Sequence, residues 1–243
     1  MRTSFPALRK RPKELTFTRA RISTGILGLD DILKGGVLPL RSYLIRGKPG
    51  TGKTLFGFHF LVKGAADGEP VLFVSLAEPD AQLRFEASTL GLTLDRVSIL
   101  DLTPAPKTFK QLPPYDIFSP SEVEREPLLQ QIARSIEIIK PRRIFFDSML
   151  HFRYAASDTF QFRRIVQSFI RFAEQHGATA LLSSEESALF PDDDLQFICD
   201  GVIHLELHDD ERILTVLKFR GSDFRPGRNI VRVTSNGMEV RAG

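Results

Sequence analysis

Apolar residues along this chain form short continuous runs, and the stretches between the runs repeat their apolar positions at helical spacing. Uninterrupted apolar runs are typical of strands covered on both faces, and they lie at residues 42–46, 71–78, 97–102, 143–148 and 178–185. Helices are predicted at residues 26–33, 55–62, 80–90, 121–139 and 158–176. The alternation predicts an α/β fold in which a mostly parallel sheet has right-handed crossovers and helices on both faces.

The last quarter of the chain has a different pattern. Residues 202–207 and 212–220 alternate around Asp209-Asp210, and residues 231–234 and 238–240 flank Asn236-Gly237. Short alternating runs around such turn residues predict β-hairpins. We therefore expect the sheet to become antiparallel toward its C-terminal end.

Composition fits a soluble globular protein. The chain has 243 residues, of which 42% are hydrophobic and 26% charged, and both fractions are ordinary. Cys199 is the one cysteine, so an internal disulfide framework is excluded. No apolar run approaches the roughly 18 residues that a membrane span needs, and the first residues lack an apolar signal segment. These features predict a cytoplasmic location without a membrane partner.

Charge is unevenly distributed along the chain. Residues 1–21 hold seven basic side chains and one acid, Glu14, whereas the whole chain has a net charge of +3. We predict a basic arm over residues 1–20 and one folded domain over residues 21–243. Such an arm is compatible with nucleic acid or an acidic partner, and equally with a solvated, poorly ordered terminus. The proline-rich stretch at 103–120 predicts a long loop.

The strongest chemical signal is at residues 47–54, which read Gly-Lys-Pro-Gly-Thr-Gly-Lys-Thr. This sequence matches G-x-x-x-x-G-K-[ST], the phosphate-binding loop called Walker A. A glycine-rich turn lets backbone N–H groups surround phosphate oxygens, and the following helix adds the positive end of its dipole. In this loop Lys53 is expected to neutralise phosphates and Thr54 to bind Mg²⁺. The predicted strand before the loop and helix after it are the context that the motif requires.

Two carboxylates follow predicted strands. Asp147 ends an apolar run and fits Walker B, the motif whose carboxylate helps to hold Mg²⁺. It would lie beside Thr54 at the same edge of the sheet. Glu78 ends the run after the Walker A helix, where a carboxylate could activate water. The alternative interpretation is that each is an ordinary loop residue.

Lys218 and Arg220 are two residues apart on a predicted strand, so they share a face. Two neighbouring cations repel unless an anion lies between them, and the γ-phosphate bound by a neighbouring subunit would be such an anion. The alternative is a solvated edge strand, where lysine commonly prevents aggregation.

Several segments together resemble one ATPase domain of the KaiC family, in the RecA-like P-loop group. The resemblance rests on Arg21-Ile22-Ser23-Thr24-Gly25, Asp30-Asp31, residues 50–56, Asp147-Ser148, Ser183-Ser184-Glu185 and Leu217-Lys218-Phe219-Arg220-Gly221. It implies a homo-oligomeric ring, usually of six subunits, with ATP and Mg²⁺ at each boundary. One subunit would bind the nucleotide through Gly47, Pro49, Gly50, Thr51, Gly52, Lys53, Thr54 and Leu55. The neighbouring subunit would contribute Lys218, Arg220, Ser222 and Thr234.

The chain departs from this family in two respects. The clock protein of the family has two such domains in tandem, whereas this chain has one. The family usually has two adjacent glutamates after the second strand, and here the pair is Ala77-Glu78. Ala77 and Glu78 are predicted as adjacent strand residues, which face opposite ways. Pro79 keeps Glu78 extended, so Glu78 is not expected to turn into the place of Ala77. We therefore expect either slow hydrolysis or another group in this role. The catalytic residues we predict are Lys53, Lys218 and Arg220, with Glu78 as the carboxylate left to act on water.

The leading hypothesis is a Mg²⁺-dependent, ATP-hydrolysing ring that acts as a switch or scaffold, with a possible protein partner. One alternative is a RecA- or RadA-like ATPase that binds nucleic acid through the basic arm. Another is a protein kinase acting on itself or on a partner. The motifs do not distinguish ATP from GTP.

Overall fold

The computed structural model describes residues 20–104, 120–187 and 191–243. Nearly all of the predicted basic arm and most of the predicted loop at 103–120 lie outside these residues, so both stay predictions. In the described part, strands and helices alternate as the apolar pattern predicts. No helix in these ranges is long and apolar enough to cross a membrane.

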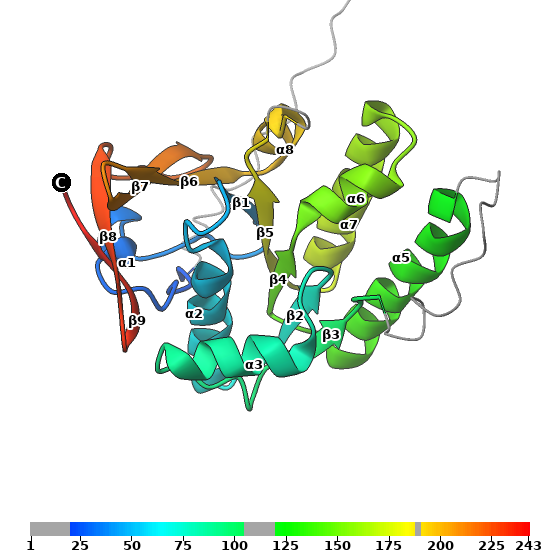
Figure 1. Ribbon diagram of the computed structural model, residues 1–243, viewed down its shortest axis with the longest axis horizontal. Helices are drawn as coiled ribbons and strands as arrows, with labels where there is room; N and C mark the ends of the chain where they lie inside the picture. The colour runs from blue at the N-terminus through cyan, green and yellow to red at the C-terminus, as the bar shows by residue number, and fades with distance from the viewer. Residues whose placement is uncertain (1–19, 105–119, 188–190) are drawn as a thin grey trace, which may run out of the picture.

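The centre of the molecule is a twisted sheet in the order β3-β2-β4-β5-β1-β6-β7-β8-β9 (Figure 1). Strand β1 lies between β5 and β6 and is parallel to both, whereas β6 to β9 pair antiparallel in sequence order. The mostly parallel sheet and its antiparallel C-terminal part are thereby confirmed. The strands are β1 (Ser42–Gly47), β2 (Val71–Ser75), β3 (Ser98–Asp101), β4 (Arg143–Asp147), β5 (Thr179–Glu185), β6 (Gly201–His208), β7 (Glu211–Phe219), β8 (Arg228–Thr234) and β9 (Gly237–Arg241).

Helices cover both faces of the sheet, as Figure 1 shows. One buried apolar cluster joins α2 and α3 to one face, and a second joins the helices from α5 to α8 to the other. The Walker A helix α2 is the most enclosed, with Phe56 and Phe60 fully buried. The helices are α1 (Leu29–Ile32), α2 (Lys53–Ala66), α3 (Asp80–Thr89), α5 (Pro120–Ile139), α6 (Met149–Ala155), α7 (Thr159–Gln175) and α8 (Asp193–Ile198).

Both predicted hairpins form. Between β6 and β7, Asp209 and Asp210 have φ values of 48° and 65°, the left-handed conformations that a two-residue hairpin turn requires. Between β8 and β9 the turn is made by Ser235 and Asn236, and Gly237 pairs with Thr234.

Three features differ from the sequence prediction. Helix α1 is shorter than the predicted 26–33, because Gly28 adopts a left-handed conformation at φ 82° and separates Ile26 from the helix. Strand β2 ends at Ser75 and does not reach Glu78. Helices α6 and α8 were not predicted from the pattern, because segments of 7 and 6 residues hold too few turns to show a helical period.

Candidate nucleotide-binding site

The Walker A loop joins β1 to α2, and the strand, loop and helix predicted for it are all present. Gly50 and Gly52 have φ values of 79° and 102°, a conformation that glycine adopts without strain. The Thr51 hydroxyl is fully buried and donates to the Lys48 carbonyl at 2.8 Å. Thr51 therefore fixes the shape of the loop from beneath.

The Lys53 side chain is bent back over its own loop. Its ammonium donates to the carbonyl oxygens of Gly47 and Lys48 at 2.9 and 3.0 Å, and the residue is 8% exposed. Burial lowers the pKa of Lys53, and the nearby carboxylates of Glu185 and Asp147 partly oppose that shift. The structure thus places a buried cation in the loop, and no carboxylate of the described residues is bonded to it.

Thr54 and Asp147 meet at the C-terminal edge of the sheet, as predicted. The Thr54 hydroxyl donates to Asp147 Oδ2 at 2.8 Å, and the Ser183 hydroxyl from β5 donates to Oδ1. Hydroxyl and carboxylate oxygens are the ligands that Mg²⁺ prefers, usually completed by phosphate and water. Within the described ranges, no group of three or more His, Cys, Asp or Glu side chains is placed so that it could hold a metal ion. This arrangement fits Mg²⁺ brought in with a nucleotide.

Glu78 lies in a turn, so the prediction that Ala77 and Glu78 are neighbouring strand residues is wrong. The Ser75 hydroxyl donates to the Glu78 carbonyl at 2.6 Å, which turns the backbone away from the sheet after β2. Strand alternation therefore does not apply here, and Ala77 and Glu78 line the same cleft. The strand ends early because the Ser75 hydroxyl bonds to the backbone of Glu78, and such local side-chain bonds compete with the hydrogen bonds of a sheet.

The Glu78 carboxyl is an unusual acid. Burial raises its pKa most, followed by the neighbouring carboxylates of Glu86 and Asp147, to about 7. Its Oε2 atom is buried and makes no hydrogen bond to the part of the chain that the structure describes. A carboxyl that is half ionised near neutral pH is suited to taking a proton from water.

These groups surround a cleft of about 510 Å³ beside the Walker A loop, within the usual size range of ligand pockets. A hollow of similar size, about 460 Å³, lies between α5 and α7, but its lining is mostly apolar and contains none of the motif residues. Among the predicted nucleotide-binding residues, the cleft is lined by Pro49, Gly50, Gly52, Lys53, Thr54 and Leu55.

The cleft also has a wall that the sequence did not reveal. Arg212 at the start of β7 and Val233 of β8 line it, together with Glu86 and Leu90 around α3. The Nε atom of Arg212 is buried without a hydrogen-bond partner among residues 20–104, 120–187 and 191–243. Arg212 belongs to no motif, and the sheet brings it to the loop from far along the chain, so no local signal could have identified it.

Lys218 and Arg220 lie together, but away from the cleft of their own chain. Lys218 Nζ donates to the carbonyls of Gln196, Phe197 and Cys199 at 2.8, 3.0 and 2.6 Å. Arg220 donates to the Phe197 carbonyl at 3.2 Å. Cations are favoured at the carbonyl end of a helix, here α8. Burial, and then Arg220, lower the pKa of Lys218.

The prediction that both cations are strand residues is wrong for Arg220, because β7 ends at Phe219. The chain turns at Arg220, and the Arg220 amide donates to the Asp200 carbonyl. Ser222 accepts a hydrogen bond from Arg21 at 2.6 Å. Thr234 accepts one from the Asn236 amide at 3.1 Å, inside the β8–β9 turn. Neither Ser222 nor Thr234 lines the cleft, so their predicted contact with a neighbour's nucleotide stays a prediction.

Comparison with known proteins agrees with this geometry. The KaiC family of ATPases matches residues 22–243. The chain belongs to this family. A KaiC-like protein from Pyrococcus horikoshii has a solved structure that superposes with a TM-score of 0.76 at 25% identity, covering 91% of this chain and 99% of that one.

Relatives within the KaiC family fall into two lengths. A UPF0273 protein of Methanocaldococcus jannaschii is 30% identical over 90% of this chain and 96% of its own. The circadian clock protein KaiC2 of Synechocystis is also 30% identical, but the match covers 89% of this chain and 39% of that protein. The chain is therefore a KaiC-like, RecA-like P-loop ATPase domain of the ATP-binding kind, similar in length to the UPF0273 proteins.

Proposed function

We propose that the protein binds Mg·ATP at the Walker A cleft, hydrolyses it slowly, and works as a ring-shaped switch or scaffold. The observation that carries this proposal is the convergence of Lys53, Thr54 and Asp147 on one cleft. Three residues from two separate parts of the sequence supply the cation, hydroxyl and carboxylate that a nucleoside triphosphate and its metal require.

Binding is assigned to the loop. The backbone N–H groups of Gly50 and Gly52 surround the phosphates, and Lys53 exchanges its loop carbonyls for phosphate oxygens. Thr54 and Asp147 hold the Mg²⁺, which when bound neutralises phosphate charge. Arg212 provides a further donor, because its Nε atom is buried in the cleft wall without a partner.

Hydrolysis is assigned to Glu78, whose carboxylate accepts the proton of the attacking water. KaiC-like proteins usually have two adjacent glutamates at this place, and here the first of the two positions is Ala77. The missing glutamate supports slow turnover. General-base assistance raises the rate by about 10²–10⁴-fold in typical enzymes, so the absence of one carboxylate can lower the hydrolysis rate by a large factor. Slow turnover suits a switch better than a motor.

Ring formation is supported by the place of Lys218 and Arg220. Both cations lie outside the cleft of their own chain, at the end of α8, where a neighbouring subunit could bring its nucleotide. In a ring of six, Lys218, Arg220, Ser222 and Thr234 would approach the phosphates bound by the next subunit. The carbonyls that now hold Lys218 would then share it with the γ-phosphate.

One experiment tests the proposal. The mass of the full chain is measured by light scattering with and without Mg·ATP, and phosphate release is followed in the same sample. We expect a discrete oligomer of about six subunits that ATP stabilises, and turnover well below the median of about 10 per second for enzymes. Asp147→Asn keeps the shape of the side chain and loses its charge, so it should fold normally and lose the Mg²⁺-dependent activity.

Other outcomes would redirect the assignment. A monomer at all ATP concentrations would refute the ring, and absence of ATP binding at millimolar concentration would refute the site. Labelled phosphate appearing on protein instead of in solution would favour the kinase hypothesis. Salt-sensitive DNA binding that disappears with residues 1–18 would favour the nucleic-acid hypothesis.

A further inference from the structure

His59 is a buried histidine in the middle of α2, the helix that begins at Lys53. It is 7% exposed. Its ring contacts two other segments of the chain: Nδ1 lies 3.1 Å from the Gly25 carbonyl, and Nε2 lies 2.7 Å from the Met238 amide nitrogen. One side chain therefore joins the N-terminal segment, the Walker A helix and β9.

The two backbone partners fix the protonation state of the ring. A carbonyl oxygen can only accept a hydrogen bond, and a backbone amide can only donate one. Nδ1 must therefore carry the proton that goes to Gly25, and Nε2 must be free to accept from Met238. The ring is neutral with both nitrogens satisfied, and burial lowers the pKa of His59 below its usual 6.5.

Near this histidine, the β8–β9 hairpin contacts both the nucleotide cleft and the Walker A loop. Val233 lines the cleft. Met238 packs against the Walker A loop, since a Cβ placed on Gly52 would lie 2.9 Å from Met238 Cε. The hairpin is seated directly on the ring, because a Cβ on Gly237 would lie only 2.2 Å from His59 Nε2.

We propose that neutral His59 is a positioning residue of the nucleotide site, which pins the β8–β9 hairpin to the Walker A helix and so holds Val233 at the cleft and Met238 against the Walker A loop. The inference rests on the proposed function only in taking the cleft as the nucleotide site. His59 does not touch the cleft itself and acts through Met238.

Acid should release the hairpin. A proton on Nε2 would face the Met238 N–H, so that two donors oppose each other and the bond breaks. The charged side chains beside the contacting residues are each engaged elsewhere: Lys63 with Asp67, Asp30 with Ser23 and Thr24, Glu239 with Arg241 and Arg21 with Ser222. No carboxylate of the described chain hydrogen-bonds the ring and could compensate an imidazolium.

The sign of the pH effect follows from the lowered pKa. Burial in the docked arrangement lowers the pKa of His59, and detachment of the hairpin, which exposes the ring to water, moves that pKa back toward the usual 6.5 of histidine. Docking is therefore complete above pH 6.5 and weakens as the pH falls below it. The docking equilibrium can shift by up to about tenfold for each pH unit in that window.

Hydrogen exchange of the β9 peptide containing Met238 tests the pin in the nucleotide-free full chain. We compare wild type with His59→Gln at pH 7.5 and 5.5, after correction for intrinsic exchange rates. The glutamine amide can donate to Gly25 and accept from Met238 but does not titrate. We expect wild type to lose protection at pH 5.5, by up to about tenfold, and His59→Gln to lose less than about twofold. Equal losses in both proteins would overturn the proposal.

Calorimetry of Mg·ATP binding at the same two pH values tests the link to the cleft. ATP affinity should fall more in wild type than in His59→Gln, by a factor similar to the loss of protection. His176→Gln, at the end of α7, is the matched control and should follow wild type. A hairpin that loosens without any affinity difference between wild type and His59→Gln overturns the positioning role. Absence of ATP binding in all proteins refutes the proposed function, and the exchange result still decides whether His59 pins the hairpin.

A direct measurement on wild type covers the case in which His59→Gln fails to fold. Nitrogen NMR of the imidazole rings distinguishes the two neutral tautomers. We expect His59 as the Nδ1–H tautomer at pH 7.5, still neutral at pH 6.5. A proton on Nε2 at pH 7.5 would overturn the proposal, because that ring cannot accept from Met238.

Discussion

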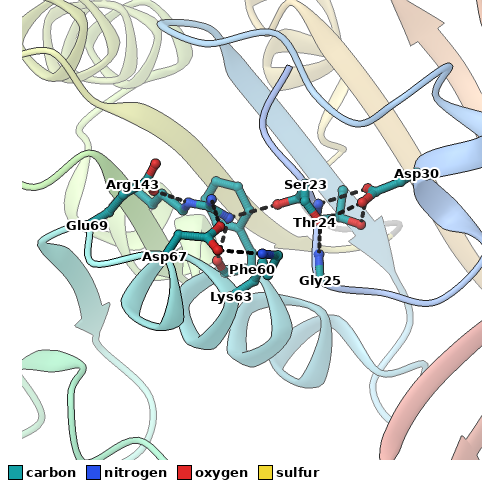
Figure 2. Close-up of polar contacts among 9 residues, drawn as sticks. All are labelled: Ser23, Thr24, Gly25, Asp30, Phe60, Lys63, Asp67, Glu69 and Arg143. Atoms are coloured by element: carbon teal, nitrogen blue, oxygen red, sulfur yellow. Dashed lines mark hydrogen bonds and ion pairs between the residues drawn. The ribbon is translucent and has the colours of Figure 1, made fainter. Parts of the chain in front are cut away.

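Strand β4 has a charged residue at each end, and the two ends differ in how completely the surrounding polar groups are hydrogen-bonded. At the start of the strand, Arg143 is 1% exposed and fully engaged (Figure 2). It donates to Glu69 at 2.5 Å, to the carbonyls of Ser23 and Phe60 at 2.7 and 3.0 Å, and to Asp67 at 3.4 Å. Its guanidinium also lies over the Phe60 ring.

At the other end of β4, Asp147 faces a cleft whose polar groups are incompletely paired. Within the described residues, Glu78 Oε2 and Arg212 Nε are buried without hydrogen-bond partners, and the Lys53 ammonium bonds only to carbonyls of its own loop. Buried polar groups in folded proteins are nearly always paired, so unpaired ones in a cleft point to a missing partner. The Arg143 network is complete without a ligand, whereas the cleft is completed by one.

The largest expected effect comes from breaking the complete network. Arg143→Met should lower the free energy of unfolding by about 3 kcal/mol, because it leaves the carbonyls of Ser23 and Phe60 without their donor. The carboxylates of Glu69 and Asp67 also lose their partner, but both are partly exposed to water. Arg142→Met, an exposed neighbour, should change it by less than about 0.5 kcal/mol. Denaturant unfolding measures both. ATP affinity of folded Arg143→Met should equal that of wild type, and a large loss would mean that the two ends are coupled.

Lys53→Ala changes the cleft at the other end of β4, and it should affect ATP affinity more than stability. ATP affinity should fall about 100-fold, because charge-assisted contacts to phosphate are lost. Stability without nucleotide should change little, since Lys53 bonds only to its own loop. Lys48→Ala is the control, being an exposed lysine of the same loop. Calorimetry decides, and unchanged affinity in Lys53→Ala would remove the site.

Ala77→Glu adds a carboxylate to the incomplete end. Ala77 is exposed and lines the cleft, so a glutamate there would reach the water beside Glu78. The hydrolysis rate should rise, by up to about 100-fold, with ATP affinity within about twofold, because the new group acts on water. If wild type already turns over rapidly and Glu78→Gln stops it, Ala77 is not a deficit.

The pH dependence of hydrolysis sharpens the same point. Glu78 has a pKa of about 7 and acts as base only when ionised, so activity should rise with pH through about 7 and be lost below it. Glu86→Gln removes the nearest like charge and should move this rise about one pH unit lower. Glu174→Gln, exposed on α7, should leave it unmoved. An unshifted profile in Glu86→Gln would mean that another group is titrating.

The contrast also explains what the sequence could predict. Lys53, Thr54 and Asp147 are identified by motif spacing, because local backbone geometry forms the phosphate loop and strand ends meet at one edge. Arg143 and Arg212 have no such signature, since their partners lie far away in the chain. The turn at Glu78 depends on one hydroxyl, that of Ser75, which apolar periodicity does not register. Oligomeric state depends on surfaces that no single-chain pattern describes.

The smallest effect is expected from deleting residues 1–18. The first described contacts of the body begin at Arg21, which donates to the carbonyls of Leu33 and Gly36 at 2.8 and 3.0 Å, and Ser23 then reaches Arg143. Deletion to residue 18 removes neither, so the melting temperature should change by less than about 2 °C. Deletion to residue 23 removes both Arg21 and a carbonyl of the Arg143 network, and it should lower the melting temperature by several degrees more. Calorimetric scans measure the melting temperatures of the two truncations. Equal values would show that the stability of the domain does not depend on the hydrogen bonds made by Arg21 and Ser23. A large drop already at residue 18 would instead mean that the basic arm stabilises the folded domain.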